Sequence, residues 1–336
     1  MVAVGVIGSG AWGTTLALLL AGKGYQTTLW EHHPERAQEM QQKRENTLFL
    51  PNVIFPPNLI ITANVAEAAR AKDLLLLVTP SQRMRENARL LAPHIAPHTL
   101  LVSASKGIEI GTLKRMTEIL AEELPSAREH IAALSGPNIA REVAERKPTA
   151  AVVAASNDEI GVRIRTLFTT QWFRVYTADD VIGVELGGAL KNIIAIGAGF
   201  NDGMGYGENA KAAFMTRGLA EISRLGIAAG ANPLTFAGLA GIGDLIATCA
   251  SPLSRNQQLG RRLAAGEKLE DILTSTRSVA EGVTTTKAAL QLAEHYGVEM
   301  PITRQLSRVL FEGLDPRKAV PQLMMRDPKD ELEGIG

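Results

Sequence analysis

The sequence has a single cysteine, Cys249, among its 336 residues. A disulfide within the chain is therefore impossible, and this cysteine usage fits the reducing cytoplasm best. No spacing of cysteine and histidine resembles a zinc site, and neither a G-x-S-x-G motif nor a P-loop is present. We therefore expect no bound metal, and the chemistry of serine hydrolases and P-loop nucleotidases is not supported.

The chain has no excess of either charge. Its 35 lysines and arginines balance 35 aspartates and glutamates, and neither half carries a basic surplus. A nucleic-acid partner or an anionic membrane surface is not expected without such a surplus. An anion site would have to be local.

No hydrophobic run is both long and unbroken. Residues 1–22 carry no charge, but Gly8, Gly10 and Gly13 interrupt them and the basic n-region of a signal peptide is missing. Glycines and Pro233 interrupt the second uncharged stretch, residues 225–243. We expect neither a membrane span nor a targeting segment.

The chain does contain a strand, a glycine turn and a helix near its start. The turn Gly8-Ser9-Gly10-Ala11-Trp12-Gly13 follows the apolar run Val2–Ile7 and precedes Thr14–Leu20. In a dinucleotide site the first glycine allows the tight turn, the second lets backbone approach the pyrophosphate, and the third packs helix on strand. We predict dinucleotide binding here by Gly8, Gly10, Ala11, Trp12 and Gly13, with an ordinary glycine-rich turn as the alternative.

The arrangement of apolar segments predicts an α/β Rossmann-type doubly wound sheet followed by an all-α domain. The length suits two domains, expected at residues 1–180 and 181–336. The predicted strands are Val2–Ile7, Gln26–Trp30, Leu74–Thr79, Thr99–Ser103, Ile131–Leu134, Thr149–Ala154 and Phe173–Tyr176. The predicted helices are Thr112–Glu123, Asp158–Phe168, Val181–Phe200, Ala210–Ala229, Arg255–Ala265 and Thr284–Tyr296.

The end of the second strand bears on the choice between NAD and NADP. An acidic residue there hydrogen-bonds the ribose 2′-hydroxyl of NAD, whereas a cation accommodates the 2′-phosphate of NADP. The chain offers Glu31, His32 and His33. Glu31 favours NAD, whereas the two histidines could receive a phosphate or simply be exposed, so the preference stays open.

Two polar segments follow predicted strands, at the edge where parallel sheets bind ligands. Ser105-Lys106-Gly107 places Lys106 there, and Ser135-Gly136-Pro137-Asn138 places Gly136 and Asn138. A solvated loop lysine is the alternative for Lys106. Capping of a helix that starts at Ile139 is the alternative for Asn138.

Two isolated charges mark the second half as the place of the chemistry. Lys191 is the only charged residue between Glu185 and Asp202, and Asp244 is the only one between Arg224 and Arg255. A buried lysine has a lowered pKa and suits general acid–base work. The small neighbours Gly187, Gly188 and Ala195 on its helix face predict space for a ligand. Asp244 could orient Lys191 or a substrate hydroxyl. The alternatives are a lysine that reaches the surface and an aspartate that caps a helix.

The segment Ser254-Arg255-Asn256 opens a predicted helix. Serine caps helices well, the first turn has free N–H groups, and arginine binds phosphate through two nitrogens. This combination predicts a cradle for a phosphate ester. A capped surface helix with solvated arginines is the alternative.

Together these motifs resemble the NAD(P)-dependent glycerol-3-phosphate dehydrogenases of the bacterial type, over nearly the whole chain. Besides the glycine turn and Ser105-Lys106-Gly107, the resemblance is carried by Gly136-Pro137-Asn138-Ile139-Ala140, Glu185-Leu186-Gly187-Gly188-Ala189-Leu190-Lys191-Asn192, Asn209-Ala210-Lys211-Ala212-Ala213, Arg217-Gly218, Gly243-Asp244-Leu245 with Thr248-Cys249, Ser254-Arg255-Asn256 and Val279-Ala280-Glu281-Gly282. It implies an N-terminal Rossmann domain, a helical C-terminal domain and an active site between them. It also implies reversible reduction of dihydroxyacetone phosphate to sn-glycerol 3-phosphate, which feeds phospholipid synthesis.

The resemblance also implies roles for individual residues. Lys191 is implied as the proton acceptor; as further catalytic residues we predict Lys106, which would help polarise the carbonyl, and Asp244, which would fix Lys191 and a hydroxyl. Substrate contacts are implied for Lys106, Gly136, Asn138, Lys191, Asp244, Ser254, Arg255 and Asn256. Cofactor contacts are implied for Trp12, His32, Lys106, Ala140, Arg255, Val279 and Glu281. Asn138 stands where bacterial relatives commonly have a hydroxyl residue, and Glu31 where they have a small or neutral one.

Two other functions remain open at the level of sequence. A β-hydroxyacid dehydrogenase pairs similar domains and uses a lysine, and Ser254-Arg255 could then bind a carboxylate. A cofactor-sensing module without catalysis would not need Lys191 and Asp244 as lone charges in apolar helices. The apolar helical half makes a homodimer plausible.

Overall fold

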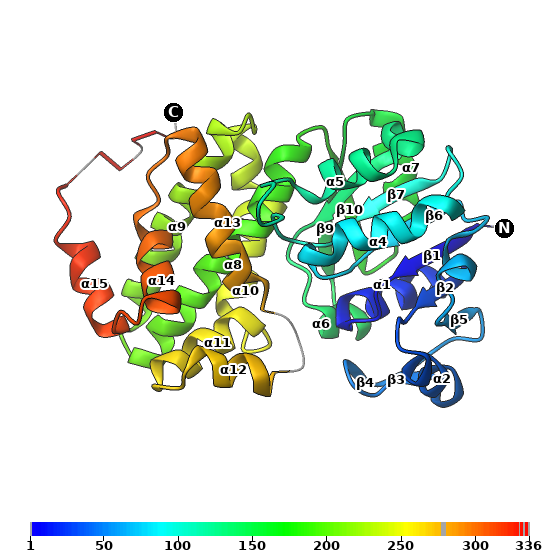
Figure 1. Cartoon of the computed structure of the whole chain (residues 1–336), viewed down its shortest axis with the longest axis horizontal. Helices are drawn as coiled ribbons and strands as arrows, with labels where there is room; N and C mark the ends of the chain where they lie inside the picture. The colour runs from blue at the N-terminus through cyan, green and yellow to red at the C-terminus, as the bar shows by residue number, and fades with distance from the viewer. Residues whose placement is uncertain (1, 277–279, 329, 332, 335–336) are drawn as a thin grey trace. The chain divides into compact units, whose positions relative to one another are not determined.

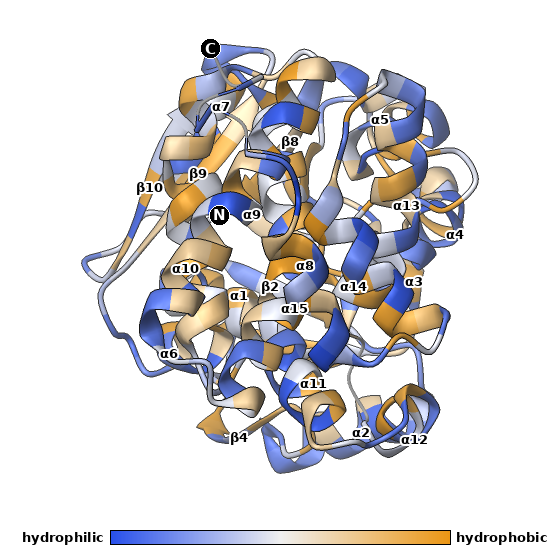
Figure 2. Cartoon of the chain, turned by 90° about the vertical axis from the view of Figure 1, so that its left-hand side faces the viewer, coloured by the Kyte–Doolittle hydropathy of each residue, from blue (hydrophilic) through white to orange (hydrophobic). Residues whose placement is uncertain are grey.

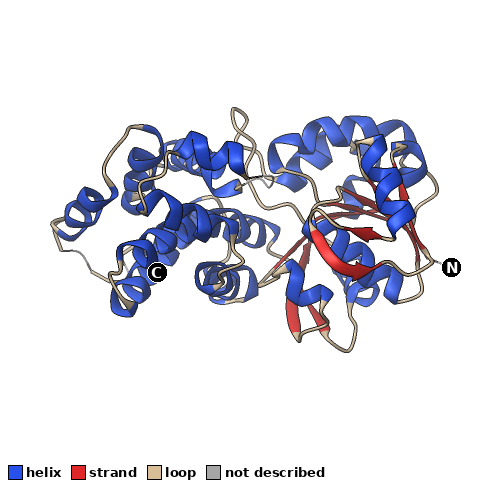
Figure 3. Cartoon of the chain, turned by 90° about the horizontal axis from the view of Figure 1, so that it is seen from below, coloured by secondary structure: helices blue, strands red, loops and turns tan. Residues whose placement is uncertain are grey.

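The computed structural model describes residues 2–276, 280–328, 330–331 and 333–334. The chain divides into two compact units, Met1–Ser105 with Met116–Val181, and Lys106–Arg115 with Ile182–Gly336 (Figure 1). All strands of the described residues lie in the first unit, and the regular elements of the second are helical (Figure 3). The short segment Lys106–Arg115 thus belongs to the helical unit although its neighbours in sequence do not.

The first unit is built on a sheet of eight strands. They are β1 (Ala3–Ile7), β2 (Gln26–Trp30), β5 (Leu59–Thr62), β6 (Leu74–Leu77), β7 (Leu100–Ser103), β8 (Ile131–Ser135), β9 (Thr149–Ala155) and β10 (Phe173–Ala178). Their order is β10-β9-β8-β7-β6-β1-β2-β5, and β3 (Glu45–Asn46) pairs separately with β4 (Leu50–Ile54). All seven strands predicted from the sequence are present, whereas β3, β4 and β5 were not predicted.

The sheet is parallel except at one pair. Strands β8 and β9 are antiparallel, with Ala133 opposite Ala154, whereas β9 and β10 are parallel. The link between β8 and β9 holds only the five-residue helix α6 (Ala140–Ala144) and returns to the end of the sheet at which β8 finished. Apolar runs do not report strand direction, so the sequence could not predict this reversal.

The leucine run of β6 lies at the centre of the sheet, between β1 and β7. Because side chains alternate along a strand, Leu74 and Leu76 join the core on one face, and Leu75 and Leu77 join the core on the other. Burial on both faces explains why this strand is apolar throughout.

Helices cover both faces of the sheet. They are α1 (Ala11–Gly22), α2 (Pro34–Lys43), α3 (Val65–Ala69), α4 (Met84–Leu91), α5 (Met116–Glu123), α6 and α7 (Asp158–Phe168). The α7 bounds match the prediction. The prediction for α5 began too early, since the preceding loop is held by a β-bridge between Ile108 and Arg115.

The second unit is organised around one buried helix. Its helices are α8 (Val181–Met204), α9 (Glu208–Ala228), α10 (Asp244–Ala250), α11 (Arg255–Ala264), α12 (Leu269–Ser275), α13 (Glu281–Tyr296), α14 (Pro301–Phe311) and α15 (Pro316–Met324). By length and composition α8 could cross a membrane, but 89% of its most apolar window is buried inside the protein. It is largely hydrophobic in Figure 2, as expected for the central helix of a core.

Candidate active site

The glycine turn between β1 and α1 has the geometry that each of its glycines was expected to provide. Gly8 has φ +112°, and a side chain there would meet the Val78 carbonyl. A side chain at Gly13 would collide with the Gly8 carbonyl, so this glycine allows the close approach of helix and strand. A side chain at Gly10 would meet no atom within 4 Å. The open side of Gly10 is where a pyrophosphate can approach the backbone.

The residues after β2 do not present a free carboxylate for a ribose hydroxyl. The Glu31 side chain has no exposed surface and accepts hydrogen bonds from Ser9 Oγ and, at 2.8 Å, from the backbone N–H of His33. It also pairs with Arg36, at 3.0 Å. His32 and His33 are exposed, with ring centroids 3.8 Å apart. Burial lowers the pKa of His32, although Glu31 opposes the shift.

The loop after β8 carries Gly136 and Asn138, and Ala140 is the first residue of α6. Gly136 has φ +125°, and a side chain there would lie 3.1 Å from Cα of Ala151. Asn138 does not cap α6, because the N-cap is Ile139 and no side chain caps it. Both polar atoms of the Asn138 side chain are buried without a hydrogen-bond partner. The capping alternative is therefore wrong, and the amide remains a candidate ligand group.

In the helical unit the two isolated charges of the sequence meet. Lys191 Nζ donates hydrogen bonds to Asp244 Oδ1 and Thr248 Oγ1. The other oxygen of Asp244 accepts a hydrogen bond from Lys106 Nζ at 2.7 Å. Lys191 and Asp244 are 6% and 1% exposed. Asp244 thus bridges two lysines with one carboxylate, and it is the first residue of α10, not its cap.

Burial and the neighbouring charges determine the pKa of Lys191. Burial lowers its pKa from 10.5 to about 8, with Asp244 opposing the shift and Lys106 adding to it. A pKa near neutrality is what a general acid–base group needs. An ammonium has three N–H donors, and beyond Asp244 and Thr248 no described residue accepts one from Lys191.

The small residues beside Lys191 serve a purpose other than the one expected. A side chain at Gly187 would lie 2.7 Å from the carbonyl oxygen of Ala240, in the turn that leads to Asp244. Gly187 therefore lets α8 approach this turn closely, which brings Lys191 and Asp244 together. At Gly187, backbone therefore occupies the space that the sequence predicted for a ligand.

A buried amide pair joins three helices next to these charges. Asn256 Nδ2 donates to Asn192 Oδ1 at 3.0 Å, and its Oδ1 accepts from the backbone N–H of Gly282 at 3.1 Å. Ser254 caps α11 by accepting a hydrogen bond from the Gln257 N–H, as predicted. Arg255 opens α11 and is attracted by Glu281, which opens α13. The predicted phosphate segment therefore lies in the same unit as Lys191, tied to the residue that follows it.

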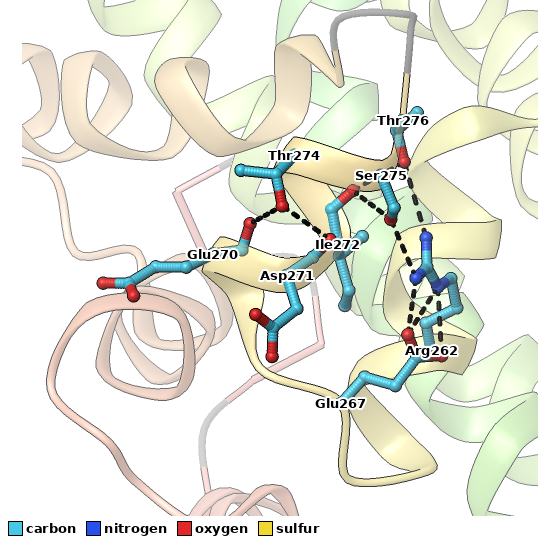
Figure 4. Close-up of polar contacts among 8 residues, drawn as sticks. All are labelled: Arg262, Glu267, Glu270, Asp271, Ile272, Thr274, Ser275 and Thr276. Atoms are coloured by element: carbon cyan, nitrogen blue, oxygen red, sulfur yellow. Dashed lines mark hydrogen bonds and ion pairs between the residues drawn. The ribbon is translucent and has the colours of Figure 1, made fainter.

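Arg262, farther along α11, has a structural role. Its guanidinium pairs with Glu267 at 3.0 Å and donates to Ser275 Oγ at 3.0 Å (Figure 4). Thr276 Oγ1, which accepts from the same guanidinium, also donates to the Ile272 carbonyl (Figure 4). The contacts anchor the end of α12 on α11, so Arg262 is occupied and is not a candidate phosphate ligand.

Some contacts were not foreseen from the sequence. Thr248 at Lys191 follows Asp244 by four residues, which is one helical turn. Asn46 donates to the Ser9 carbonyl and to Thr14 Oγ1, both at 2.8 Å, and so fixes the glycine turn from β3. Phe49 lies against Arg36, whose Cζ is 5.0 Å from the ring centroid. No local signal marked Asn46 or Phe49, because their roles depend on the unpredicted β3–β4 hairpin.

The predicted residues fall into two groups. The first unit carries Gly8, Gly10, Ala11, Trp12, Gly13, His32, His33, Gly136, Asn138 and Ala140, and the helical unit carries Lys106, Lys191, Asp244, Ser254, Arg255, Asn256 and Glu281. Val279 lies outside the described residues. Lys106 joins the group of Lys191 because its segment folds with the helices.

Comparison with known families decides the membership of the chain. Residues 3–161 match the model for the N-terminus of NAD-dependent glycerol-3-phosphate dehydrogenase, and residues 180–321 match the model for its C-terminus. The chain belongs to this family. The matched ranges cover both the glycine turn and the cluster around Lys191.

Relatives that match along nearly their whole length support the same family membership. The chain is 52% identical over 329 residues to glycerol-3-phosphate dehydrogenase [NAD(P)+] of Geobacter metallireducens, with 98% of each chain covered. It is 48% identical to the enzyme of that name from Lysinibacillus sphaericus, covering 98% of this chain and 97% of the relative. The crystal structure of glycerol-3-phosphate dehydrogenase from Coxiella burnetii superposes with a TM-score of 0.92 at 38% identity, covering 96% and 99%.

More distant structures share the fold alone. The ketopantoate reductase of Ralstonia eutropha has a TM-score of 0.61 at 17% identity. The comparisons thus favour the glycerol-3-phosphate dehydrogenase interpretation over a β-hydroxyacid dehydrogenase or a sensing module.

Proposed function

We propose that the chain interconverts dihydroxyacetone phosphate and sn-glycerol 3-phosphate with NADH or NADPH, and thereby supplies glycerol 3-phosphate for phospholipid synthesis. The observation that carries this proposal is the buried cluster of Lys191, Asp244 and Lys106 in a chain whose full-length relatives bear that enzyme name. We also place the enzyme in the cytoplasm, which fits its single buried cysteine.

The proton step falls to Lys191. In the reduction its ammonium donates a proton to the oxygen of the forming alkoxide, and in the oxidation the neutral amine takes the proton of the hydroxyl. Its third N–H is the donor that can point at that oxygen. Asp244 holds Lys191 in place and stabilises its charged form, and Lys106, on the other carboxylate oxygen, adds positive charge for the carbonyl.

The phosphate of the substrate is assigned to the start of α11. Arg255 supplies a permanent charge and two donors, and the helix N-terminus favours an anion. Asn256 supplies a further amide, fixed by Asn192 and Gly282. Binding energy from the phosphate would hold the carbonyl carbon in place for the transfer. Asn138 and Gly136 are assigned as further substrate contacts.

The nicotinamide dinucleotide is assigned to the first unit, with its pyrophosphate at Gly8–Gly13. The residues fit this group, because Gly10 leaves its outer side open and α1 begins there without a capping side chain. Trp12, His32, His33 and Ala140 are assigned to it from this unit, and Lys106, Arg255, Val279 and Glu281 from the other. When bound, the cofactor supplies or accepts the hydride.

A rate comparison tests the function. Purified protein is given NADH or NADPH with dihydroxyacetone phosphate, with unphosphorylated dihydroxyacetone, or with a 2-keto acid, and cofactor oxidation is followed. We expect turnover with dihydroxyacetone phosphate at least about a hundredfold above the other two, because the phosphate provides binding energy. Faster turnover of the keto acid would favour the β-hydroxyacid alternative, and cofactor binding without any turnover would favour the sensing module.

We further propose that two copies associate through the end of the helical unit. Met324 and Met325 are 78% and 85% exposed, and α9, α14 and α15 line a mainly apolar hollow of ≈ 1000 Å³. Exposed apolar surface of this kind is typical of association sites. Light scattering should give a dimer mass for the protein and for Ile54→Glu, a control at another exposed position. The double variant Met324→Glu/Met325→Glu should be monomeric, and a monomeric native protein would refute the proposal.

A further inference from the structure

The carboxylate of Glu31 is buried and surrounded by groups of the protein itself. Oε1 accepts the His33 N–H at 2.8 Å and lies 3.2 Å from His32 Nδ1. Oε2 accepts from Ser9 Oγ and lies 3.0 Å from a terminal nitrogen of Arg36. Two of the about four acceptor sites of the carboxylate are hydrogen-bonded, and His32 and Arg36 lie at ion-pair distance from its oxygens. A ribose hydroxyl would have to displace one of these groups.

Arg36 is the neighbour whose donors remain available. One terminal nitrogen, Nη2, is buried and lies 3.0 Å from Glu31 Oε2, as an ion pair that does not have hydrogen-bond geometry. None of the residues that the structure describes accepts a hydrogen bond from this guanidinium. The guanidinium has five N–H donors, and its side chain is partly exposed, so an anionic group from outside the chain can accept hydrogen bonds from it.

The guanidinium is also held at a fixed place. The ring of Phe49 lies against it, with 5.0 Å from Cζ to the ring centroid, and the Arg36 side chain is only 26% exposed. Through Glu31 it is linked to Ser9 of the glycine turn. Its surroundings also include Glu39 on the same helix, the exposed His32 and His33 at the end of β2, and Arg83, whose charge acts on His32.

We propose that Arg36 recognises the 2′-phosphate of NADP, and that Glu31 is a positioning residue that holds Arg36 and the glycine turn instead of binding the ribose. The proposal rests on the proposed function, since it requires a dinucleotide at Gly8–Gly13. A planar guanidinium suits a phosphate because it donates two parallel hydrogen bonds. An acidic residue at the end of β2 is then compatible with NADP, because its carboxylate pairs with the guanidinium of Arg36 and holds it in place.

Binding of adenosine fragments tests the proposal without catalysis. Calorimetric titration of the full chain with 2′,5′-ADP and with 5′-AMP compares ligands with and without the 2′-phosphate. Arg36→Ala should weaken 2′,5′-ADP by about ten- to a hundredfold, as expected for charged hydrogen bonds, and should change 5′-AMP less than about twofold. Arg36→Lys, which keeps the charge but loses the planar fork, should fall in between. Lys43→Ala, an exposed cation on the same helix paired with Glu39, should change neither.

Glu31→Gln separates positioning from ribose binding. We expect Glu31→Gln to bind 2′,5′-ADP more weakly than the native protein does, because Arg36 loses its ion pair. The ratio of the affinities for 2′,5′-ADP and 5′-AMP should not rise. A ribose ligand would behave in the opposite way, with 5′-AMP weakened and 2′,5′-ADP strengthened, and that result would overturn the assignment. Unchanged 2′,5′-ADP binding by a folded Arg36→Ala would overturn it too. A native protein that binds neither fragment would instead refute the dinucleotide site itself.

Discussion

Lys191 and Asp244 are 53 positions apart in the chain and form an ion pair that is almost fully buried. Burying two charges costs several kcal/mol per ion, and only close pairing with further hydrogen bonds offsets it. Asp244 receives such bonds from both Lys191 and Lys106, and Lys191 has Thr248 as a second partner. The pair is therefore held in one geometry, and this is the requirement for a lysine that must exchange a proton at a defined atom.

If Lys191 transfers the proton as proposed, the two reaction directions should depend on pH in opposite ways. Its pKa of about 8 means that the ammonium form is lost as the pH rises through that value. Reduction of dihydroxyacetone phosphate needs the ammonium, so its kcat should fall above about pH 8. Oxidation of glycerol 3-phosphate needs the amine, so its kcat should rise through the same range. Steady-state rates in both directions across the range check this, and profiles that move together would contradict it.

Removal of the amine should abolish most of the proton transfer. We expect Lys191→Ala to lower kcat about a hundred- to ten-thousandfold, the usual contribution of a general acid–base group. The variant should remain folded, as circular dichroism can verify, and should still bind NADH at the first unit. Near-normal turnover by the folded variant would remove Lys191 from the mechanism.

Asp244→Asn tests the bridging carboxylate. The substitution keeps the shape but removes the charge that opposes the effect of burial on Lys191, so the pKa of Lys191 should fall further. The pH profile for glycerol 3-phosphate oxidation should then shift to lower pH. Thr248→Val is the matched control, because it removes a hydrogen bond to the same nitrogen and leaves the charge. An equal shift in both variants would show that hydrogen bonding, not charge, sets the pKa.

Gly187 should control how closely Lys191 approaches Asp244. A methyl group there would meet the Ala240 carbonyl oxygen at 2.7 Å, so Gly187→Ala should push α8 away from the turn before Asp244. We expect a loss of about 1–3 kcal/mol in unfolding free energy, as for other overpacked sites, and a lowered kcat. Gly22→Ala, at a helical position with no atom within 4 Å, should leave both unchanged or slightly raise stability.

Features that depend on local pattern were predictable. The Rossmann-type sheet followed from alternating apolar runs, and the lone charges Lys191 and Asp244 stood out because a charge in an apolar helix needs a partner. The sequence offered Asp244 as a partner of Lys191 but left a substrate hydroxyl and a helix cap as alternatives, because the choice depends on how closely Gly187 lets two segments approach.

Features that depend on pairing between distant segments were not predictable. Glu31 has the position of a ribose ligand, but its buried carboxylate accepts hydrogen bonds from Ser9 and His33 and pairs with Arg36. Likewise Lys106 comes directly after the segment that holds β7 of the first unit. It nevertheless belongs to the helical unit, where its side chain binds Asp244. The same sequence pattern is compatible with either arrangement, and only the contacts separate them.

A buried carboxylate far along the chain makes stability depend on pH. Glu221 of α9 is 1% exposed and accepts hydrogen bonds from the backbone N–H groups of Ile302 and Thr303, at 2.5 Å and 3.1 Å, so it caps α14. Burial raises its pKa from 4.5 to about 7, although these donors oppose the shift. The folded protein then binds the proton more tightly than the unfolded chain does between these two values.

The sign of the effect follows from this difference. The contribution of Glu221 is fully present below about pH 4.5 and is lost as the pH rises to about 7, at up to about 1.4 kcal/mol per pH unit. Glu221→Gln removes the titration, so the difference in unfolding free energy between native protein and variant should change across this window and be constant above it. Glu294→Gln, an exposed site on α13, should run parallel to the native protein. Denaturant unfolding at several pH values measures both differences, and a parallel Glu221→Gln curve would show that this carboxyl keeps its ordinary pKa because the α14 donors outweigh its burial.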